Sequence, residues 1–331
     1  MRRRNFISLV GGAVAWPLGV LAQQPDRVRR IGVLTLYSQT DREGQARIAV
    51  FVDVLQRLGW TDGRNVRIEY RWSAGDAVRE KASAAELVRS TTDVIVVAGW
   101  TGLAELQRLT STIPVVFTQV SDPLGSGFVT SLARPGGNIS GFQNFEPPIG
   151  GKWLGVLKEA APNMRRAAVL FGSDSVATVA MLHAAEAVAP SLNVQVTAVD
   201  IHGDVGGVEI ERAIATFASQ PDGGLVITSH PSVPANRQSI ILLAARHRLP
   251  TVYPFRYFAA EGGLMSYGPD TIDQWRGAAT YVDRILRGEK PGDLPIQAPT
   301  KYELVINLKA AKVIGLNIPP TLLLRVDEVI E

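Results

Sequence analysis

Short apolar runs alternate with longer amphipathic segments along most of the chain. The first run, residues 30–36 (RIGVLTL), is typical of a buried strand. In the segment after it, Ile48, Phe51 and Leu55 recur at the spacing of one helix face. Gly59 stands where a helix of that length would end. The alternation predicts parallel strands connected by crossover helices, which is an α/β fold.

The same pattern continues to the end of the chain. Further buried strands are expected at residues 65–72, 93–98, 113–120, 139–142, 165–171, 223–229, 249–255, 264–268 and 302–306. Thr40-Asp41-Arg42-Glu43 and Thr271-Ile272-Asp273-Gln274 match capping boxes and predict helices that begin there. Asp122 is expected to cap a helix opened by the turn at residues 123–127, and a terminal helix is expected from about residue 320.

The order of elements in the first half of the chain occurs again in the second half. Residues 165–172 (RRAAVLFG) are patterned like residues 29–36 (RRIGVLTL), and residues 223–229 echo residues 93–99. We therefore expect two doubly wound parallel-sheet lobes, joined by a hinge near residues 141–148.

The expected lobes are not contiguous in sequence, because the chain beyond residue 264 must pack against earlier elements. Residues 23–142 with about 270–300 are assigned to lobe 1, and residues 143–269 with about 301–331 to lobe 2. A connection crossed more than once is typical of proteins whose lobes close on a ligand.

The amino terminus has the three parts of an export signal. Arg2, Arg3 and Arg4 precede an apolar stretch that ends at Ala22, which predicts a signal of residues 1–22 cleaved before Gln23. Paired arginines followed by a phenylalanine favour the twin-arginine export route. The alternative is an uncleaved membrane anchor, although glycine and proline within the stretch weaken a spanning helix.

Removal of this segment changes the charge balance. The chain has 34 Lys+Arg and 31 Asp+Glu, of which the segment holds three and none, so the remainder is neutral (34 − 3 − 31 = 0). The remainder therefore has no basic footprint for nucleic acid. The absence of cysteine excludes disulfides and a lipid-modified cysteine. A periplasmic location fits these features.

Ligands of open parallel sheets bind beyond the carboxyl ends of the strands. The loops there are rich in hydroxyls and aromatic rings and contain few lysines or arginines. Their candidate ligand-binding residues are Tyr37, Ser38, Gln39, Trp100, Thr101, Gln119, Ser121, Asp122, Ser173, Asp174, Ser175, Ser229, His230, Tyr253 and Phe255.

This set suits a small ligand with a flat apolar body and a polar or anionic end. The body would stack on Trp100, and a carboxylate would lie against the helix start at Ser173 to Ser175. The alternatives are that each Ser or Thr only caps a helix, that Trp100 fills the core of its lobe, and that Asp122 is a cap.

Motifs for catalysis or cofactor binding do not occur. The sequence has no P-loop, no H-E-x-x-H, no G-x-S-x-G and no G-x-G-x-x-G after the first strand. Of the four histidines, only His230 lies in an expected cleft loop, and no third partner can be named for a Ser229–His230 pair. His202 is expected to stand alone after a strand. We expect no catalytic residue, metal or cofactor.

Three segments together resemble a known family: residues 120–142 (VSDPLGSGFVTSLARPGGNISGF), residues 262–270 (GGLMSYGPD) and the tail from residue 293. They are similar to the periplasmic substrate-binding proteins of the tryptophan/tyrosine-type ABC transporter family. The resemblance implies a type I periplasmic-binding fold that delivers its ligand to a permease in the inner membrane.

The resemblance also implies positions in the cleft. It adds Asn144 and Tyr267 to the candidate ligand-binding residues, beside loops already named. Family members with known preferences take aromatic amino acids, so an amino-acid-like ligand is implied. The sequence departs from the family at Tyr37-Ser38-Gln39-Thr40, where many relatives have a His-Pro pair.

The functional hypothesis is a monomeric solute-binding component of an ABC importer that captures a small molecule by hinge closure. Two other classes stay open: a periplasmic sensor subunit that presents its closed form to a receptor, and a hydrolytic enzyme on the same fold. A transcription factor is disfavoured, because an export signal occupies the place of a DNA-binding headpiece.

Overall fold

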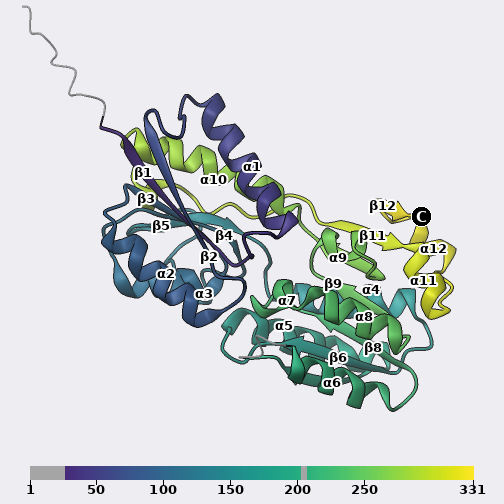
Figure 1. The fold of residues 1–331 in the computed structure, drawn as a ribbon. Helices are drawn as coiled ribbons and strands as arrows, with labels where there is room; N and C mark the ends of the chain where they lie inside the picture. The colour runs from purple at the N-terminus through teal and green to yellow at the C-terminus, as the bar shows by residue number, and fades with distance from the viewer. Residues whose placement is uncertain (1–26, 203–206) are drawn as a thin grey trace, which may run out of the picture.

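The computed structural model describes residues 27–202 and 207–331. They form two lobes, each a β-sheet with helices on both faces (Figure 1). The export signal expected at residues 1–22 lies outside the described residues. No helix within them is both long and apolar enough to cross a bilayer.

The first lobe holds a five-stranded parallel sheet in the order β2-β1-β3-β4-β5. Its strands are β1 (Arg29–Thr35), β2 (Val66–Trp72), β3 (Val94–Ala98), β4 (Val115–Val120) and β5 (Ile139–Gln143). Helices α1 (Arg42–Arg57) and α10 (Thr271–Leu286) pack on one face, and α2 (Ala77–Arg89) and α3 (Trp100–Leu109) on the other. Alternate residues of β3 face the two layers, as the pleat requires.

The second lobe holds a seven-stranded sheet in the order β12-β11-β10-β9-β8-β6-β7. Its strands are β6 (Arg166–Phe171), β7 (Gln195–Asp200), β8 (Gly223–Ile227), β9 (Thr251–Tyr253), β10 (Met265–Gly268), β11 (Glu303–Asn307) and β12 (Glu328–Ile330). Only the β10–β11 pair among the described strands is antiparallel.

Helices of several lengths surround this sheet. They are α4 (Ile149–Ala160), α5 (Val176–Val188), α6 (Val208–Ala218), α7 (Ser232–Ala235), α8 (Arg237–Arg246), α9 (Arg256–Ala260), α11 (Leu308–Ile314) and α12 (Pro320–Leu323), with 3-10 turns η1 (Ala189–Leu192) and η2 (Pro291–Asp293).

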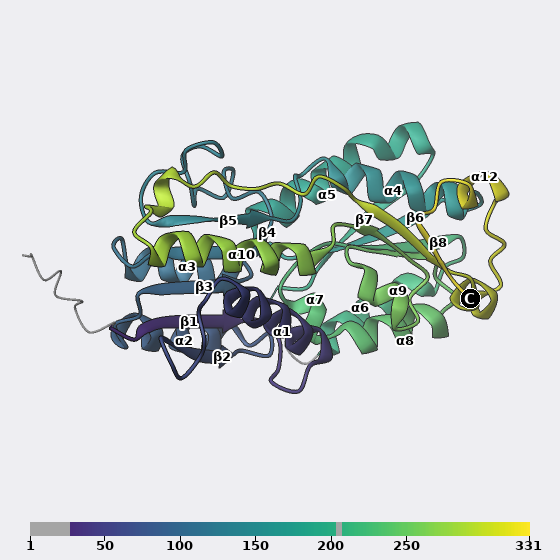
Figure 2. The ribbon, with the colours of Figure 1, turned by 90° about the horizontal axis from the view of Figure 1, so that it is seen from above.

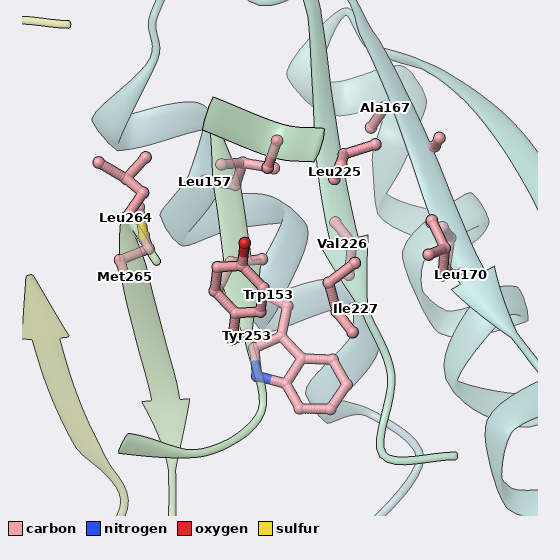
Figure 3. Packing of buried hydrophobic residues seen from close by; sticks show 14 of the residues in the cluster. Trp153, Leu157, Ala167, Leu170, Leu225, Val226, Ile227, Tyr253, Leu264 and Met265 are labelled. Atoms are coloured by element: carbon pink, nitrogen blue, oxygen red, sulfur yellow. The ribbon is translucent and has the colours of Figure 1, made fainter. Parts of the chain in front are cut away.

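Part of the core of the second lobe lies between α4 and the sheet. Trp153 is fully buried, and its indole Nε1 donates to the carbonyl of Tyr267 at 2.7 Å. Figure 3 shows Trp153 beside Tyr253 and the side chains of β8. Phe145 packs edge-on against the indole at a centroid distance of 5.0 Å.

Three segments connect the lobes, and they lie side by side. They join β5 to α4, β10 to α10, and η2 to β11. The backbone N–H of Gln143 donates to the carbonyl of Gln297 at 2.9 Å, and Gln274 Nε2 donates to Asn144 Oδ1 at 2.7 Å. In Figure 2 the tail can be followed from α10 in one lobe to β11 in the other. Such a bundle of crossings can act as a hinge.

Both expected capping boxes are wrong by one residue. Asp41 caps α1, where its carboxylate accepts the N–H groups of Glu43 and Gly44, and Asp270 caps α10. The hydroxyl of Thr271 instead accepts a hydrogen bond from Arg47 at 2.5 Å. In each case an adjacent aspartate takes the role assigned to threonine.

Two further expectations for local structure are corrected. Residues 123–128 form a turn and no helix, in which Asp122 Oδ1 accepts from Gly125 N at 2.9 Å and Gly127 has a φ of 75°. Asp122 is therefore the start of an Asx turn. The terminal helix from residue 320 is one turn long, and it leads to β12, an edge strand that the pattern did not reveal.

Candidate functional site

A cavity lies between the two lobes, at the carboxyl ends of their strands. Its volume is about 20 Å³, close to the space that one water molecule needs. It is lined by Leu36, Gly99, Trp100, Gln119, Ser121, Asn144, Ser175, Ala177, Thr178, Ser229, His230, Pro231, Pro234 and Phe255. A ligand larger than water therefore requires the lobes to move apart.

Trp100 forms the aromatic part of the wall from the first lobe. It is the first residue of α3, and Gly99 before it has a φ of 100°, a conformation that favours glycine. The Trp100 ring packs edge-on against Phe128 at 6.4 Å between centroids. Its indole Nε1 is buried and has no hydrogen-bond partner. The indole N–H is therefore a donor with unused capacity, enclosed beside the cavity.

Glu80 lies behind this helix start. Its Oε1 accepts the N–H of Gly102 at 2.8 Å, and Oε2 is 3.4 Å from the hydroxyl of Ser73. Burial raises the pKa of Glu80 to about 7, and these two hydrogen bonds oppose that rise. Glu80 thus supplies the cap that Gly99, which has no side chain, cannot supply.

Gln119 at the end of β4 is held in an unusual backbone conformation. Its φ is 56°, next to a register shift between β4 and β5. Its Nε2 donates to Tyr37 Oη at 2.9 Å, and its backbone N–H donates to Gln274 Oε1 at 2.8 Å. Non-glycine residues in this region are strained and cluster at functional sites.

A hydroxyl pair crosses the cavity. Ser121 follows β4 in the first lobe, Ser229 follows β8 in the second, and their Oγ atoms are 3.1 Å apart. This contact exists only while the lobes are close together.

The start of α5 forms part of the wall from the second lobe. Ser175 caps the helix, and its Oγ accepts the N–H of Thr178 at 3.4 Å. The hydroxyl of Thr178 donates back to the carbonyl of Gly172 at 2.7 Å. These bonds fix the loop after β6 against the helix.

His230 is held by a chain of polar contacts. Its Nε2 is 2.9 Å from Asp174 Oδ1, and His202 Nδ1 is 3.1 Å from Asp174 Oδ2, so His202 does not stand alone. Burial would raise the pKa of Asp174, but the hydrogen bond and charge of His230, with those of His202, lower it. His230 Nδ1 accepts the N–H of Ser232 at 3.3 Å. Both ring nitrogens are therefore engaged, and Nε2 carries the proton.

The structure brings part of the expected set together on this cavity. Of the residues named from the sequence, those that line it are Trp100, Gln119, Ser121, Asn144, Ser175, Ser229, His230 and Phe255. Those that do not line it are Tyr37, Ser38, Gln39, Thr101, Asp122, Ser173, Asp174, Tyr253 and Tyr267.

Several of the second group support the wall from behind. Tyr37 is buried and contacts Gln119, and Asp174 orients His230. Tyr253 is fully buried in the core of the second lobe, where its ring stacks on Phe258 at 5.0 Å. Its side chain points into the lobe because it occupies an inward position of a short strand.

The others make contacts away from the cavity. Thr101 is buried within α3. Ser38 and Gln39 lie in a partly exposed loop, where the carbonyl of Gln39 accepts from Gln45. The Ser173 N–H donates to Asp200, and the Tyr267 ring packs against Tyr302 at 5.8 Å.

Sequence reasoning did not name some of the lining residues. They are Leu36, Gly99, Ala177, Thr178, Pro231 and Pro234. Gly99 and Pro231 lie in loops that the sequence predicts at the cleft, next to the candidate residues Trp100 and His230. Ala177 and Thr178 lie in the first turn of α5, just after the candidate residue Ser175. Their place in the first turn of a helix that begins at the cleft was the feature of the sequence that could have identified them.

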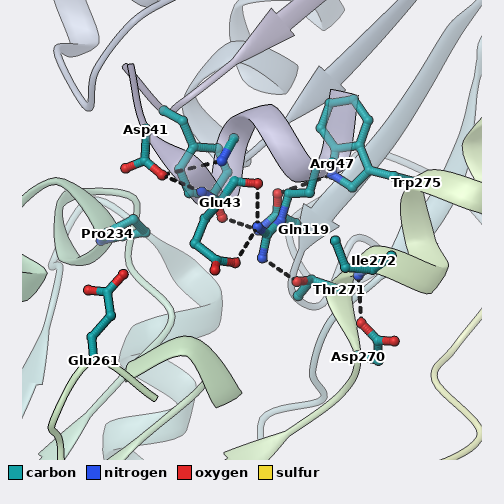
Figure 4. Close-up of polar contacts among 12 residues, drawn as sticks. Asp41, Glu43, Arg47, Gln119, Pro234, Glu261, Asp270, Thr271, Ile272 and Trp275 are labelled. Carbon is teal, nitrogen blue, oxygen red and sulfur yellow. Dashed lines mark hydrogen bonds and ion pairs between the residues drawn. The ribbon is translucent and has the colours of Figure 1, made fainter. Parts of the chain in front are cut away.

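Charged and aromatic residues join the lobes at the mouth of the cleft. Arg237 of α8 pairs with Asp41 of the first lobe and with Glu261 of its own lobe. Arg47 is buried, donates to Glu43, and lies 5.5 Å from the ring centroid of Tyr257 in the second lobe. Figure 4 shows Asp41 just before α1 and Arg47 within it, with Pro234 and Glu261 of the second lobe opposite Asp41.

Comparison with known proteins agrees with this architecture. Residues 41–330 match the family described as ABC transporter substrate binding protein. A tyrosine-binding protein of Clostridioides difficile strain R20291 is 23% identical over 273 residues, which are 81% of this chain and 76% of that protein.

Solved structures show the same fold. A conserved domain protein of Vibrio cholerae O1 biovar El Tor has a TM-score of 0.83 at 24% identity, over 92% of this chain and 100% of that one. An ABC domain from Streptococcus pneumonia in complex with L-Trp has a TM-score of 0.82 at 22% identity, over 91% and 99%. The fold is that of type I periplasmic binding proteins, and the chain belongs to the ABC transporter substrate-binding protein family.

Proposed function

We propose that the protein captures a small molecule with a flat apolar body and a polar or anionic end, and presents it to an inner-membrane permease. The observation that carries this proposal is the cavity between the lobes, to which both lobes contribute polar and apolar groups. Trp100 and Phe255 supply apolar surface, and the hydroxyls of Ser121 and Ser229 supply polar contacts.

The closed arrangement of the two lobes is what the permease recognises. A ligand that touches both lobes binds the closed form better than the open form, and that difference in affinity drives closure. The contacts between Asp41 and Arg237 and between Ser121 and Ser229 also form only on closure. The permease can then recognise the loaded protein by its shape.

We propose that the protein catalyses no reaction. A serine nucleophile needs a hydrogen-bonded base. The Ser229 hydroxyl contacts Ser121 Oγ and Met181 Sδ, whereas His230 contacts Asp174 and Ser232. This arrangement supports a structural role for His230.

The proposal includes the cellular setting. Residues 1–22 act as an export signal, by the twin-arginine route, and the mature protein works as a periplasmic monomer that does not bind nucleic acid. The tyrosine-binding relative and the L-Trp complex support a small aromatic compound as the ligand class.

Thermal unfolding against a panel of amino acids, aromatic acids, short-chain acids, nucleosides and sugars tests the proposal. A ligand at 100 times its dissociation constant stabilises the native state by about 2.7 kcal/mol, which raises the melting temperature. Trp100→Ala is expected to abolish the shift. Trp60→Ala is the matched control, because Trp60 contacts Asp283 and neither residue lines the cavity. Turnover of any panel member would overturn the binding function.

A further inference from the structure

The polar groups on the cavity wall are almost all neutral. Among the described residues that line it, none is Asp, Glu, Lys or Arg. The polar side chains are those of Gln119, Ser121, Asn144, Ser175, Thr178, Ser229 and His230. A ligand with a cationic amine would therefore find no carboxylate on the wall.

Three carboxylates around the cleft are already engaged. Asp174 is shared by two histidines, and Glu80 accepts hydrogen bonds behind α3. Asp41 at the mouth is paired with Arg237. None of these three residues lines the cavity.

The wall instead offers hydrogen-bond donors. Trp100 Nε1 is buried without a partner. Asn144 Oδ1 accepts from Gln274 at 2.7 Å, so its Nδ2 is the group left to face a ligand. By contrast, Gln119 uses its Nε2 on Tyr37 and its Oε1 on Trp275. The amide group of Asn144 and the indole of Trp100 that remain unpaired are thus donors, which suit an acceptor on the ligand.

Two helices also begin at this wall. Gly99 and Trp100 lie at the start of α3, and Ser175, Ala177 and Thr178 lie at the start of α5. The amino-terminal end of a helix carries partial positive charge, which favours an anion and disfavours a cation. The partial charge of the helix ends and the unpaired donors therefore both favour an anionic group on the ligand.

We infer that the ligand is an aromatic carboxylate without an amino group. This inference rests on the proposed capture function and narrows it. The ring packs on Trp100 and Phe255 when the lobes separate to admit it, and the carboxylate accepts from the donors of the wall. An α-ammonium group would be buried without a counter-charge, which is unfavourable.

Isothermal titration calorimetry with matched ligands tests the inference on the full chain. The pairs are L-phenylalanine with 3-phenylpropionate, and L-tyrosine with 3-(4-hydroxyphenyl)propionate. We expect each deaminated acid to bind at least about 100-fold more tightly than its amino acid, because only the amino acid buries an unpaired charge.

Two variants sharpen the test. Trp100→Phe keeps an aromatic ring but removes the unpartnered Nε1–H, and is expected to weaken binding of the acid about fivefold to tenfold. Ser229→Asp adds a carboxylate to the wall and is expected to shift the preference toward the amino acid at least tenfold. Ser229→Asn is the control for size and folding.

The outcomes separate the inference from the function on which it rests. Amino acids that bind as tightly as their deaminated partners, or binding confined to sugars or nucleosides, would overturn the aromatic carboxylate and leave ligand capture intact. No binding by any compound class would overturn the capture function as well.

Discussion

The carboxylate of Asp41 and the guanidinium of Arg237 meet across the mouth of the cleft, with Oδ2 and Nη1 2.5 Å apart. Asp41 caps α1 in the first lobe, and Arg237 is the first residue of α8 in the second. Burial opposes the charge on Arg237, but hydrogen bonds to Glu261 and Asp41 raise its pKa, so it stays protonated. The pair therefore stabilises the closed arrangement relative to an open one.

Asp41→Asn is expected to favour the open form. Asparagine can still cap α1 through its side-chain oxygen, so the helix keeps its start while the ion pair is lost. We expect affinity for the compound found in the thermal panel to fall roughly tenfold, which is about 1.4 kcal/mol. Small-angle scattering of the unliganded protein should show a larger radius of gyration.

Asp53→Asn is the control for this change. It removes an exposed ion pair with Arg57 within α1, which does not join the lobes. If both variants bind with wild-type affinity, the Asp41–Arg237 pair has no part in closure.

Arg47→Ala is expected to lower the free energy of unfolding by about 2–4 kcal/mol. Arg47 is 1% exposed, and it donates to Glu43 and to Thr271 of α10. Arg57→Ala should cost less than about 0.5 kcal/mol, because its ion pair on the same helix is exposed. Urea unfolding of both variants measures the difference, and equal effects would contradict the structural role of Arg47.

Gly150 and Gly155 of α4 should respond to alanine in opposite directions. A Cβ on Gly150 would lie 1.9 Å from the carbonyl oxygen of Met181 in α5, so Gly150→Ala must push the helices apart and cost about 1–3 kcal/mol. A Cβ on Gly155 would meet nothing within 4 Å, so Gly155→Ala should stabilise the protein by about 0.5–1 kcal/mol. Chemical denaturation compares them, and a stabilising Gly150→Ala would refute the close packing.

Glu80→Gln should change how stability depends on pH. The pKa of Glu80 is about 7 in the folded protein, above its ordinary value of 4.5. The unfolded chain therefore loses this proton first as pH rises. The stability that protonated Glu80 contributes is complete below about pH 4.5 and is lost as pH rises to 7, up to roughly 3 kcal/mol.

Glutamine can still accept from Gly102, but it does not ionise. As the pH rises from 5 to 8, we therefore expect the free energy of unfolding of Glu80→Gln to increase by about 1–3 kcal/mol relative to that of the wild type. Glu86→Gln is the control, since Glu86 lies exposed on the same helix and pairs with Arg71. Urea unfolding at pH 5 and at pH 8 measures the free energy of unfolding of both proteins. If that free energy changes by the same amount between the two pH values in the wild type and in Glu80→Gln, the raised pKa of the buried carboxyl is contradicted.

The sequence by itself determined the fold class and the order of most elements. Apolar runs such as residues 94–98 are buried on both faces of a parallel sheet, so their pattern is local and easily recognised. It also located the loops at the carboxyl ends of the strands, because parallel topology places them at one edge. Trp100 and Ser175 could be named for this reason.

Only the tertiary structure decided which loop side chains face the cavity. Tyr253 and Phe255 are two residues apart, yet one lies in the core and the other on the wall. The contacts of Asp41 with Arg237 and of Asp174 with both histidines join residues far apart in sequence. Such contacts depend on how strands and helices pack within a lobe and how the two lobes pack together, and local periodicity carries no information about that packing.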